Sequence, residues 1–334
     1  MTMDLQRVVV IGAGAFGTAL AVVAARSGRD VCLVTRNEIH SGHIRDRHAN
    51  EKYLPGVAIH DEIDAAHDVS AAADADLVLM AVPSQATRAT AEKLAAHLRP
   101  GVPVIACAKG LERDTGLRQT EILSECLPGA VLGALSGPGF AREIAHGLPT
   151  AVTVASTDMA VARHVSSALS TDDFRCYASD DPVGVELGGA AKNVLAIACG
   201  IAAGKGLGES ARAALISRGL AEMTRLGTAL GARPETFMGL SGLGDLVLTA
   251  TSTASRNTSF GIGLGEGRSV HELLASGEPL AEGAHTARTA ALLAREHEVD
   301  APIIAAVAAI LDGAITVDEA IDGLVTRPLK AENA

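Results

Sequence analysis

The sequence predicts an α/β protein in which an N-terminal Rossmann-type doubly wound sheet is followed by an all-α C-terminal domain. Two observations predict this fold. Short β-branched runs alternate with longer alanine-rich segments in the first half of the chain, and after about residue 185 only the helical pattern continues. Alternating strands and helices form a mostly parallel sheet that is covered on both faces. We therefore divide the chain into residues 1–185 and residues 186–334.

The expected elements follow one another in order along the chain. A first strand at 7–12, a glycine turn, a helix at 16–28 and a second strand at 30–35 form the first unit. Further strands are expected at 76–82, 102–108, 130–136 and 150–156, with a helix at 84–98. Beyond the boundary, helices are expected at 183–203, 209–230, 283–297, 301–312 and 317–324.

Composition excludes several classes of protein. Hydrophobic residues make up 48% of 334 residues, which is too many for a disordered chain, and the formal charge of −11 disfavours nonspecific binding to nucleic acid or to an anionic membrane. The five cysteines form no C-x-x-C pair or Cys/His cluster, so we expect no metal site and no disulfide framework. No signal peptide is evident, and the apolar run at 301–311 is too short to span a bilayer. The expectation is a soluble cytoplasmic protein without a membrane segment.

A glycine motif provides the first functional signal. Gly12, Gly14 and Gly17 form a G-x-G-x-x-G that follows a strand and opens a helix. In this context the glycines allow a tight turn, close approach of a pyrophosphate and packing of helix on strand. The alternative is an ordinary glycine turn of an α/β protein. The full strand–turn–helix–strand context favours a dinucleotide-binding domain over residues 1–185.

The end of the second strand indicates the type of dinucleotide. NAD enzymes usually place an acidic residue there, about 20 residues after the motif, to bind the ribose hydroxyls. This strand ends in Thr35-Arg36-Asn37. A guanidinium pairs with a 2′-phosphate, so Arg36 favours NADP over NAD, with NADPH as the reductant. The alternative is a solvated arginine at a strand end.

Two lysines stand out against the aliphatic background. Lys109 directly follows a strand, at the sheet edge where open parallel sheets bind ligands, although an exposed loop lysine is the alternative. Lys192 and Asn193 lie in the otherwise apolar stretch 188–200, near the start of an expected buried helix at the domain junction. A snorkelling lysine is the alternative there. Desolvation lowers the pKa of a buried lysine toward neutrality, which suits a general acid or base.

A third polar grouping lies at residues 239–261. It combines glycine turns, the carboxylate of Asp245 and the cluster Ser255-Arg256-Asn257. An arginine beside two small hydrogen-bonding residues is suited to binding phosphate, and a polar loop with a solvated arginine is the alternative.

Several long motifs follow one another along nearly the whole chain. They include GAGAFGTALA, NEKYLPGV, AVPSQ, AKGLE, LSGPGFAREI, the stretch 192–223, GLGDLVLTATSTASRN and the pair at 282–283. In these motifs and in their order the chain resembles the NAD(P)-dependent glycerol-3-phosphate dehydrogenases of the bacterial type. The family interconverts dihydroxyacetone phosphate and sn-glycerol 3-phosphate for phospholipid synthesis. The resemblance implies a Rossmann domain, a helical substrate-binding domain over residues 186–334, and a homodimer.

Roles are carried over only where motif positions match. The resemblance implies catalytic roles for Lys192 as proton donor and acceptor, helped by Lys109 and Asp245. We expect the substrate to contact Lys109, Gly137, Gly139, Lys192, Asn193, Asp245, Thr249, Ser255, Arg256 and Asn257. We expect NADP or NAD to contact Gly12, Gly14, Ala15, Phe16, Gly17, Arg36, Lys109, Ala141, Arg256, Leu280 and Glu282. In this hypothesis Asn193 bonds to the reacting oxygen, while Arg256 and Asn257 grip the phosphate.

Two positions depart from the family pattern. Gly139 and Ala15 stand where the family commonly has a hydroxyl residue. A side-chain hydroxyl is therefore missing at each position, although the backbone N–H of Gly139 can still serve, and neither change removes a residue that the chemistry needs. Two other functions stay open on the residues alone. One is a hydroxyacid dehydrogenase whose carboxylate substrate uses Arg256, and the other is a nucleotide-sensing module without chemistry. Lys109, Lys192 and Asp245 argue against the sensor, because a sensor needs no proton donor.

Overall fold

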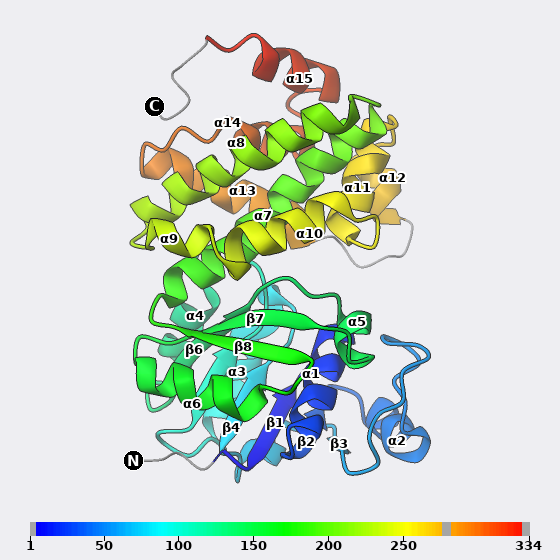
Figure 1. Ribbon diagram of the computed structural model, residues 1–334, viewed down its shortest axis with the longest axis vertical. Helices are drawn as coiled ribbons and strands as arrows, with labels where there is room; N and C mark the ends of the chain where they lie inside the picture. The colour runs from blue at the N-terminus through cyan, green and yellow to red at the C-terminus, as the bar shows by residue number, and fades with distance from the viewer. Residues whose placement is uncertain (1–4, 276–281, 329–334) are drawn as a thin grey trace.

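A computed structural model of the chain describes residues 5–275 and 282–328 and contains an eight-stranded sheet with a helical region stacked on its end (Figure 1). The strand order is β3-β2-β1-β4-β5-β6-β7-β8. The strands are β1 (Arg7–Ile11), β2 (Asp30–Val34), β3 (Asp64–Ala66), β4 (Leu77–Met80), β5 (Pro103–Ala106), β6 (Val131–Ser136), β7 (Thr150–Ala155) and β8 (Phe174–Ser179). The order of the first six strands is that of a Rossmann fold, so the predicted fold class is confirmed.

Two features of the sheet were not predicted. β7 runs antiparallel to β6, whereas every other neighbouring pair is parallel. β3 and β8 were absent from the prediction because β3 is a three-residue strand of Asp and Ala, and β8 mixes polar and apolar residues at the edge of the sheet. The strands that were predicted are all present, with ends shifted by a residue or two.

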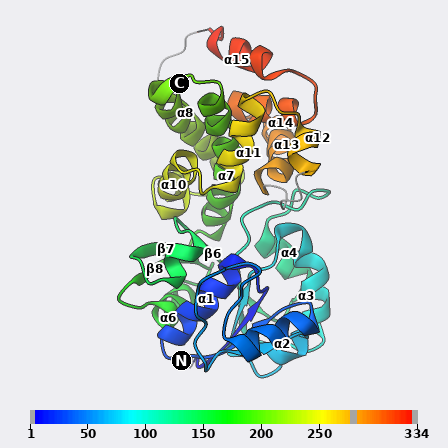
Figure 2. The ribbon, with the colours of Figure 1, turned by 90° about the vertical axis from the view of Figure 1, so that its right-hand side faces the viewer.

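Both faces of the sheet are covered. Alternate residues of β1 enter different clusters, because successive side chains of a strand point to opposite faces. Val8 and Val10 pack in the cluster that contains α1 (Ala15–Arg26) and α6 (Met159–Leu169). Val9 and Ile11 pack in a second cluster, which lies on the opposite face of the sheet. The cluster on this second face contains residues of η1 (Val69–Ala72), α3 (Thr87–Ala95) and α4 (Gln119–Cys126), and η2 (Ser84–Ala86) leads directly into α3. On the first face α5 (Ala141–Ala145) lies beside α1, and α2 (Glu38–Arg47) packs against β3 (Figures 1 and 2).

The second half of the chain is helical, as predicted. Its elements are α7 (Pro182–Gly204), α8 (Gly208–Ala229), α9 (Pro234–Phe237), the π-helical turn η3 (Leu240–Gly244), α10 (Asp245–Thr251), α11 (Arg256–Gly265), α12 (Val270–Ala275), α13 (Glu282–Glu296), α14 (Pro302–Leu311) and α15 (Val317–Val325). The segment 239–261, expected to contain glycine turns or a polar loop, is instead mostly helical. The boundary at 185/186 stays a prediction, and it falls four residues into the continuous helix α7.

Helix α7 is the axis of the helical region. Nearly all of its residues are buried, and it packs against α8, α10, α11 and α13 as well as the end of the sheet. α11 approaches α7 unusually closely, because a Cβ on Gly200 or on Gly261 would lie 2.2 Å from a carbonyl oxygen of the other helix. Among the helices that the structure describes, α7 alone is long and apolar enough to cross a bilayer, but 89% of its apolar window is buried inside the protein. Such burial is typical of a core helix.

Candidate active site at the domain interface

The glycine motif forms the turn between β1 and α1, at the point where the strand order reverses. Gly12 has a φ of +115°, and a Cβ there would lie 2.5 Å from the Ala81 carbonyl oxygen. A Cβ on Gly14 would meet no atom within 4 Å, so this position opens onto free space. Gly14 also begins α1 without any side-chain cap, which leaves backbone N–H groups of the first turn available for an anion. The turn therefore fits a dinucleotide pyrophosphate.

Three charged side chains from three elements meet beside this turn. Lys109 Nζ lies 2.6 Å from Asp245 Oδ2, and Lys192 Nζ lies 3.0 Å from Asp245 Oδ1. Lys109 follows β5, Lys192 lies in α7 and Asp245 is the first residue of α10, so the cluster joins the two halves of the chain. Lys109 Nζ also lies 5.8 Å from the centroid of the Phe16 ring, which connects the cluster to the glycine motif.

Each ammonium has a further partner that fixes its position. Lys109 Nζ donates a hydrogen bond to the Gly137 carbonyl oxygen at 2.8 Å, and Lys192 Nζ donates to Thr249 Oγ1 at 2.7 Å. Thr249 Oγ1 in turn lies 3.3 Å from Asp245 Oδ1, one helical turn away on α10. Glycines allow this convergence, because a Cβ on Gly189 would lie 2.5 Å from Ser136 Oγ and 3.4 Å from the Lys109 side chain.

Burial sets the electrostatics of the cluster. Lys192 is 7% exposed and Asp245 is 1% exposed. Burial lowers the pKa of Lys192 to about 8, against the opposing effect of Asp245 and with help from the nearby charge of Lys109. Burial by itself would raise the pKa of Asp245, but the two ammonium groups outweigh it and hold that pKa below its usual value. Lys192 can therefore exchange a proton near neutral pH while Asp245 stays ionised.

A chain of amides extends from this cluster toward α11 and α13. Asn193 Nδ2 donates to the Lys109 carbonyl oxygen at 3.1 Å, and Asn193 Oδ1 accepts from Asn257 Nδ2 at 2.9 Å. Asn257 Oδ1 then accepts from the Gly283 backbone N–H at 3.0 Å. Both asparagines are buried. The Asn193 amide thus holds protein groups at both ends, and its expected bond to the reacting oxygen stays a prediction.

The cluster Ser255-Arg256-Asn257 forms the start of α11. Ser255 is the N-cap, and its side chain accepts from the Thr258 backbone N–H. Arg256 is exposed at the first helical position, and within residues 5–275 and 282–328 it has no hydrogen bond or ion pair. A helix N-terminus beside a free guanidinium is suited to a phosphate.

Glu282 lies close to these basic groups. Burial raises the pKa of its carboxyl group, while the charges of Arg256, Lys192 and Lys109 and a hydrogen bond from the Ser84 backbone act in the opposite direction. The start of α13 therefore lies within electrostatic reach of the lysine pair and of α11, although no sequence spacing indicated this.

The other expected positions fall in different surroundings. Arg36 is exposed two residues beyond the end of β2, whose last residue, Val34, accepts a hydrogen bond from the Gly12 backbone. Ala141 opens α5 beside α1. A Cβ on Gly139 would lie 2.9 Å from Ile144 Cδ1, so a hydroxyl residue there would require the isoleucine to move. Leu280 lies outside the described residues.

One expectation about Lys192, and the alternative that was weighed against its function, differ from the structure. It was expected near the start of its helix, but it lies in the middle of α7, eleven residues into a 23-residue element. Its side chain is also not a snorkelling one, because it ends on Asp245 and Thr249 inside the protein. Asn50, the first residue of the motif NEKYLPGV, and Gln119 were assigned no role from the sequence, and both side chains are buried. Asn50 donates to the Ala13 carbonyl oxygen of the glycine motif at 2.9 Å, and Gln119 donates to Gly110 next to Lys109 at 2.7 Å.

Comparison with known proteins identifies related sequences along the whole chain. Residues 7–162 match the N-terminal part of the NAD-dependent glycerol-3-phosphate dehydrogenase family, and residues 181–322 match its C-terminal part. The glycerol-3-phosphate dehydrogenase (NAD(P)+) of Parvibaculum lavamentivorans is 50% identical over 332 residues, which cover 99% of this chain and 100% of that protein. The enzyme of the same name from Mesorhizobium japonicum is 51% identical over 327 residues, covering 98% of this chain and 94% of that protein.

Solved structures give the same result. The crystal structure of glycerol-3-phosphate dehydrogenase from Coxiella burnetii superposes with a TM-score of 0.91 at 36% identity, covering 96% of this chain and 99% of that one. A ketopantoate reductase family protein from Ralstonia eutropha, at 18% identity and a TM-score of 0.61, shares the fold alone.

Proposed function

The chain belongs to the NAD-dependent glycerol-3-phosphate dehydrogenase family, and on this premise we propose that it interconverts dihydroxyacetone phosphate and sn-glycerol 3-phosphate with Lys192 as proton donor and acceptor. The observation that carries the proposal is the buried Lys192–Asp245–Lys109 cluster beside the glycine turn. It offers a proton and excess positive charge where an alkoxide forms. The fit of Gly12 and Gly14 to a pyrophosphate supports cofactor binding at the same place.

In the reductive direction, the ketone carbon C2 of the substrate becomes a secondary alcohol. The nicotinamide of NAD(P)H, when bound, supplies the hydride that C2 receives. As charge develops on the substrate oxygen, the ammonium of Lys192 transfers a proton to it, and Lys109 stabilises the remaining negative charge. Asp245 holds both ammonium groups in place and stays ionised. In the oxidative direction, neutral Lys192 removes the proton of the C2 hydroxyl group.

Binding of the substrate's phosphate group by the protein orients C2. We assign this role to Arg256, Asn257 and the N-terminus of α11, which the hydrogen bonds of Ser255 and Asn257 hold in place. Binding energy from a remote, nonreacting group is then used to position the reacting carbon, which contributes part of the rate. Gly137, Gly139 and Thr249 would line the same space.

Replacing Arg256 with alanine tests the phosphate assignment. We expect the KM for dihydroxyacetone phosphate to rise about ten- to a hundredfold, because a charge-assisted hydrogen bond contributes about 1.5–3 kcal/mol. The dissociation constant of NADPH, measured by fluorescence titration, should change much less than this KM, although Arg256 is also expected to contact the cofactor. An effect confined to the cofactor would contradict the assignment. Arg268, a basic residue beyond the end of α11 that pairs with Glu266, is the matched control, and its alanine variant should keep the wild-type KM.

NADPH is the proposed reductant, because an exposed arginine rather than an acidic residue follows β2. Initial rates with dihydroxyacetone phosphate should be higher with NADPH than with NADH at equal, subsaturating concentration. Arg36→Ala should raise the KM for NADPH roughly tenfold and leave that for NADH nearly unchanged. Equal rates with both cofactors, or no effect of the substitution, would contradict the preference. A panel that includes 2-oxo acids separates this activity from that of a hydroxyacid dehydrogenase, since only the phosphorylated ketone should be reduced.

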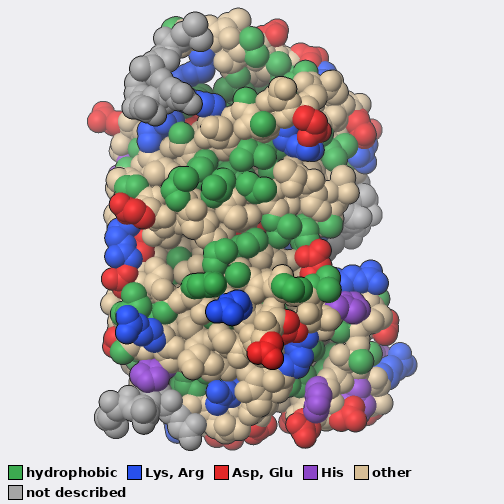
Figure 3. All heavy atoms as spheres, viewed as in Figure 1, with side chains coloured by type: hydrophobic (Ala, Val, Ile, Leu, Met, Phe, Trp, Pro, Cys, Tyr) green, Lys and Arg blue, Asp and Glu red, His purple; other side chains and the backbone are tan. Residues whose placement is uncertain are grey.

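We further propose that the enzyme works in the cytoplasm as a homodimer and supplies glycerol 3-phosphate for phospholipid synthesis. Free cysteines support a reducing compartment. An apolar groove between α7, α8, α14 and α15 supports self-association, and Figure 3 shows apolar side chains gathered in patches on one face of the helical half. Light scattering coupled to size-exclusion chromatography tests the dimer through its mass.

A further inference from the structure

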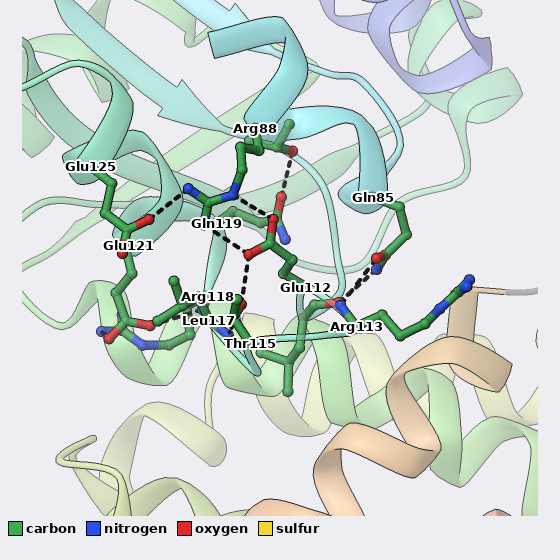
Figure 4. Close-up of polar contacts among 12 residues, drawn as sticks. Gln85, Arg88, Glu112, Arg113, Thr115, Leu117, Arg118, Gln119, Glu121 and Glu125 are labelled. Atoms are coloured by element: carbon green, nitrogen blue, oxygen red, sulfur yellow. Dashed lines mark hydrogen bonds and ion pairs between the residues drawn. The ribbon is translucent and has the colours of Figure 1, made fainter. Parts of the chain in front are cut away.

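Three consecutive carbonyl groups around Lys109 each accept a hydrogen bond from the side-chain amide of a different element. The Lys109 oxygen accepts from Asn193 of α7 at 3.1 Å, the Gly110 oxygen accepts from Gln119 of α4 at 2.7 Å, and the Leu111 oxygen accepts from Gln85 of η2 at 2.7 Å. These carbonyls belong to the loop 107–118 between β5 and α4. Figure 4 shows Gln85 and Gln119 approaching this loop from two sides.

We propose that Gln119 and Gln85 are positioning residues that hold the loop 107–118 so that the ammonium group of Lys109 reaches Asp245 and the substrate. The inference rests on the proposed function of the lysine cluster. Neither glutamine contacts that cluster directly, so each acts through the backbone next to Lys109.

Both ends of the Gln119 side-chain amide are paired with groups of the protein. Its side chain is 1% exposed, its Nε2 donates to Gly110, and its Oε1 accepts from Thr87 Oγ1, which is equally buried. A buried amide with both ends paired in this way has one orientation, because turning it over would place its oxygen against the Gly110 carbonyl oxygen, acceptor against acceptor, and leave that carbonyl unpaired. Gln119 therefore joins the Gly110 carbonyl group of the loop to Thr87, the first residue of α3, and fixes the distance between the two.

Gln85 and Glu112 hold the outer side of the loop. Gln85 Oε1 accepts from the Arg113 backbone N–H at 3.1 Å, so this amide pairs with the loop in both directions. The Glu112 carboxylate accepts from Arg88 Nε and Nη2, at 2.9 and 2.8 Å, and from Thr115 (Figure 4). The hydrogen bonds from Arg88 hold the pKa of Glu112 below its usual value, so this contact persists at neutral pH.

The position of the loop matters because Lys109 must reach across the interface between the two halves of the chain. Its ammonium contacts Gly137 and Asp245 at once, at 2.8 and 2.6 Å, and its charge is one of those that lower the pKa of Lys192. Small displacements of a charged group at a reacting centre reduce rates strongly. If the loop moved, the pKa of Lys192 would rise, because Lys109 would withdraw and Asp245 would pair with Lys192 alone.

The test is Gln119→Met, which keeps the length of the side chain and removes the amide. We expect kcat/KM for dihydroxyacetone phosphate to fall about ten- to a hundredfold, while the dissociation constant of NADPH stays within about twofold, since the glycine turn is untouched. The pKa of Lys192, on which Asp245, Lys109 and Glu282 all act, sets the inflection in the pH profile of sn-glycerol 3-phosphate oxidation. This inflection should move to higher pH. Gln85→Met, at an exposed position, should act in the same direction and provides the test if the first variant does not fold.

A double-mutant cycle separates positioning from general stability. In a Lys109→Met background, Gln119→Met should cost little further kcat/KM, because the group that it positions is absent. Ser156→Ala is the matched control, since Ser156 is buried and donates one hydrogen bond, to the Leu132 carbonyl oxygen near the start of β6, and its loss should lower only the Tm. The inference is overturned if Gln119→Met lowers the Tm without changing kcat/KM, or if its effect multiplies fully with that of Lys109→Met. Lack of turnover by the wild-type enzyme would instead contradict the proposed function.

Discussion

Lys192→Met lowers kcat in both directions by about 10²–10⁴-fold, the range that general acid–base catalysis contributes. Methionine fills the volume of the lysine stem but carries no proton to give to the alkoxide. The glycine turn is made by other residues, so the dissociation constant of NADPH should be nearly that of the wild type. Stopped-flow and steady-state rates with dihydroxyacetone phosphate, together with fluorescence titration of NADPH, measure the two effects separately.

Lys205→Met provides the control for this experiment. Lys205 directly follows the last residue of α7 and pairs with Asp318, far from the lysine cluster. Its replacement should leave kcat near the wild-type value. If Lys192→Met kept wild-type turnover, Lys192 would not be the proton donor.

Asp245→Asn is the second change with a large expected effect. It keeps the shape of the side chain but removes the only negative charge that contacts both ammonium groups at hydrogen-bond distance among the residues of the described chain. Removing one partner of a buried ion pair costs about 3–5 kcal/mol, because the remaining charge is left uncompensated. We expect kcat/KM to fall at least a hundredfold and the Tm to decrease.

The direction of the pH shift distinguishes this variant from those of the loop. Asp245 raises the pKa of Lys192, so its loss should lower that pKa and move the oxidation profile to lower pH, opposite to Gln119→Met. Asp318→Asn, which removes the partner of Lys205, should change neither rate nor profile. A shift of the Asp245→Asn profile to higher pH would contradict the assigned electrostatics.

The fold was predictable because its signals are local. Alternating strands and alanine-rich helices, and the glycine motif between β1 and α1, indicate a Rossmann sheet from the sequence alone. The antiparallel β7 was not predictable, since strand direction depends on the path of the connection rather than on the composition of the strand. The helical form of 239–261 was also missed, because its glycines indicate turns, whereas here Gly242 and Gly244 belong to a π-helical turn that brings Asp245 into the interface.

The candidate site was predictable only in part. Lys109, Lys192 and Asp245 were selected as polar residues in apolar surroundings and from motif resemblance, and the structure brings all three within hydrogen-bond distance. The residues that hold these three side chains in position were not predicted. Gln119 lies in an ordinary polar stretch and Gln85 ends the motif AVPSQ, but neither position indicates which backbone carbonyl group the side chain meets after folding. Such long-range pairings leave no periodic trace in the sequence.

The pH dependence of kcat/KM for sn-glycerol 3-phosphate oxidation, measured between pH 6 and 10 on the wild type and on Lys192→Met, tests the central claim most directly. Oxidation requires neutral Lys192, and burial lowers the pKa of this lysine to about 8. The wild-type rate should therefore rise with pH and level off above an inflection near that value, and the inflection should be absent from the residual rate of the variant. An identical inflection in both proteins, or a wild-type rate that stays flat through this range, would contradict the assignment of Lys192 as the proton acceptor.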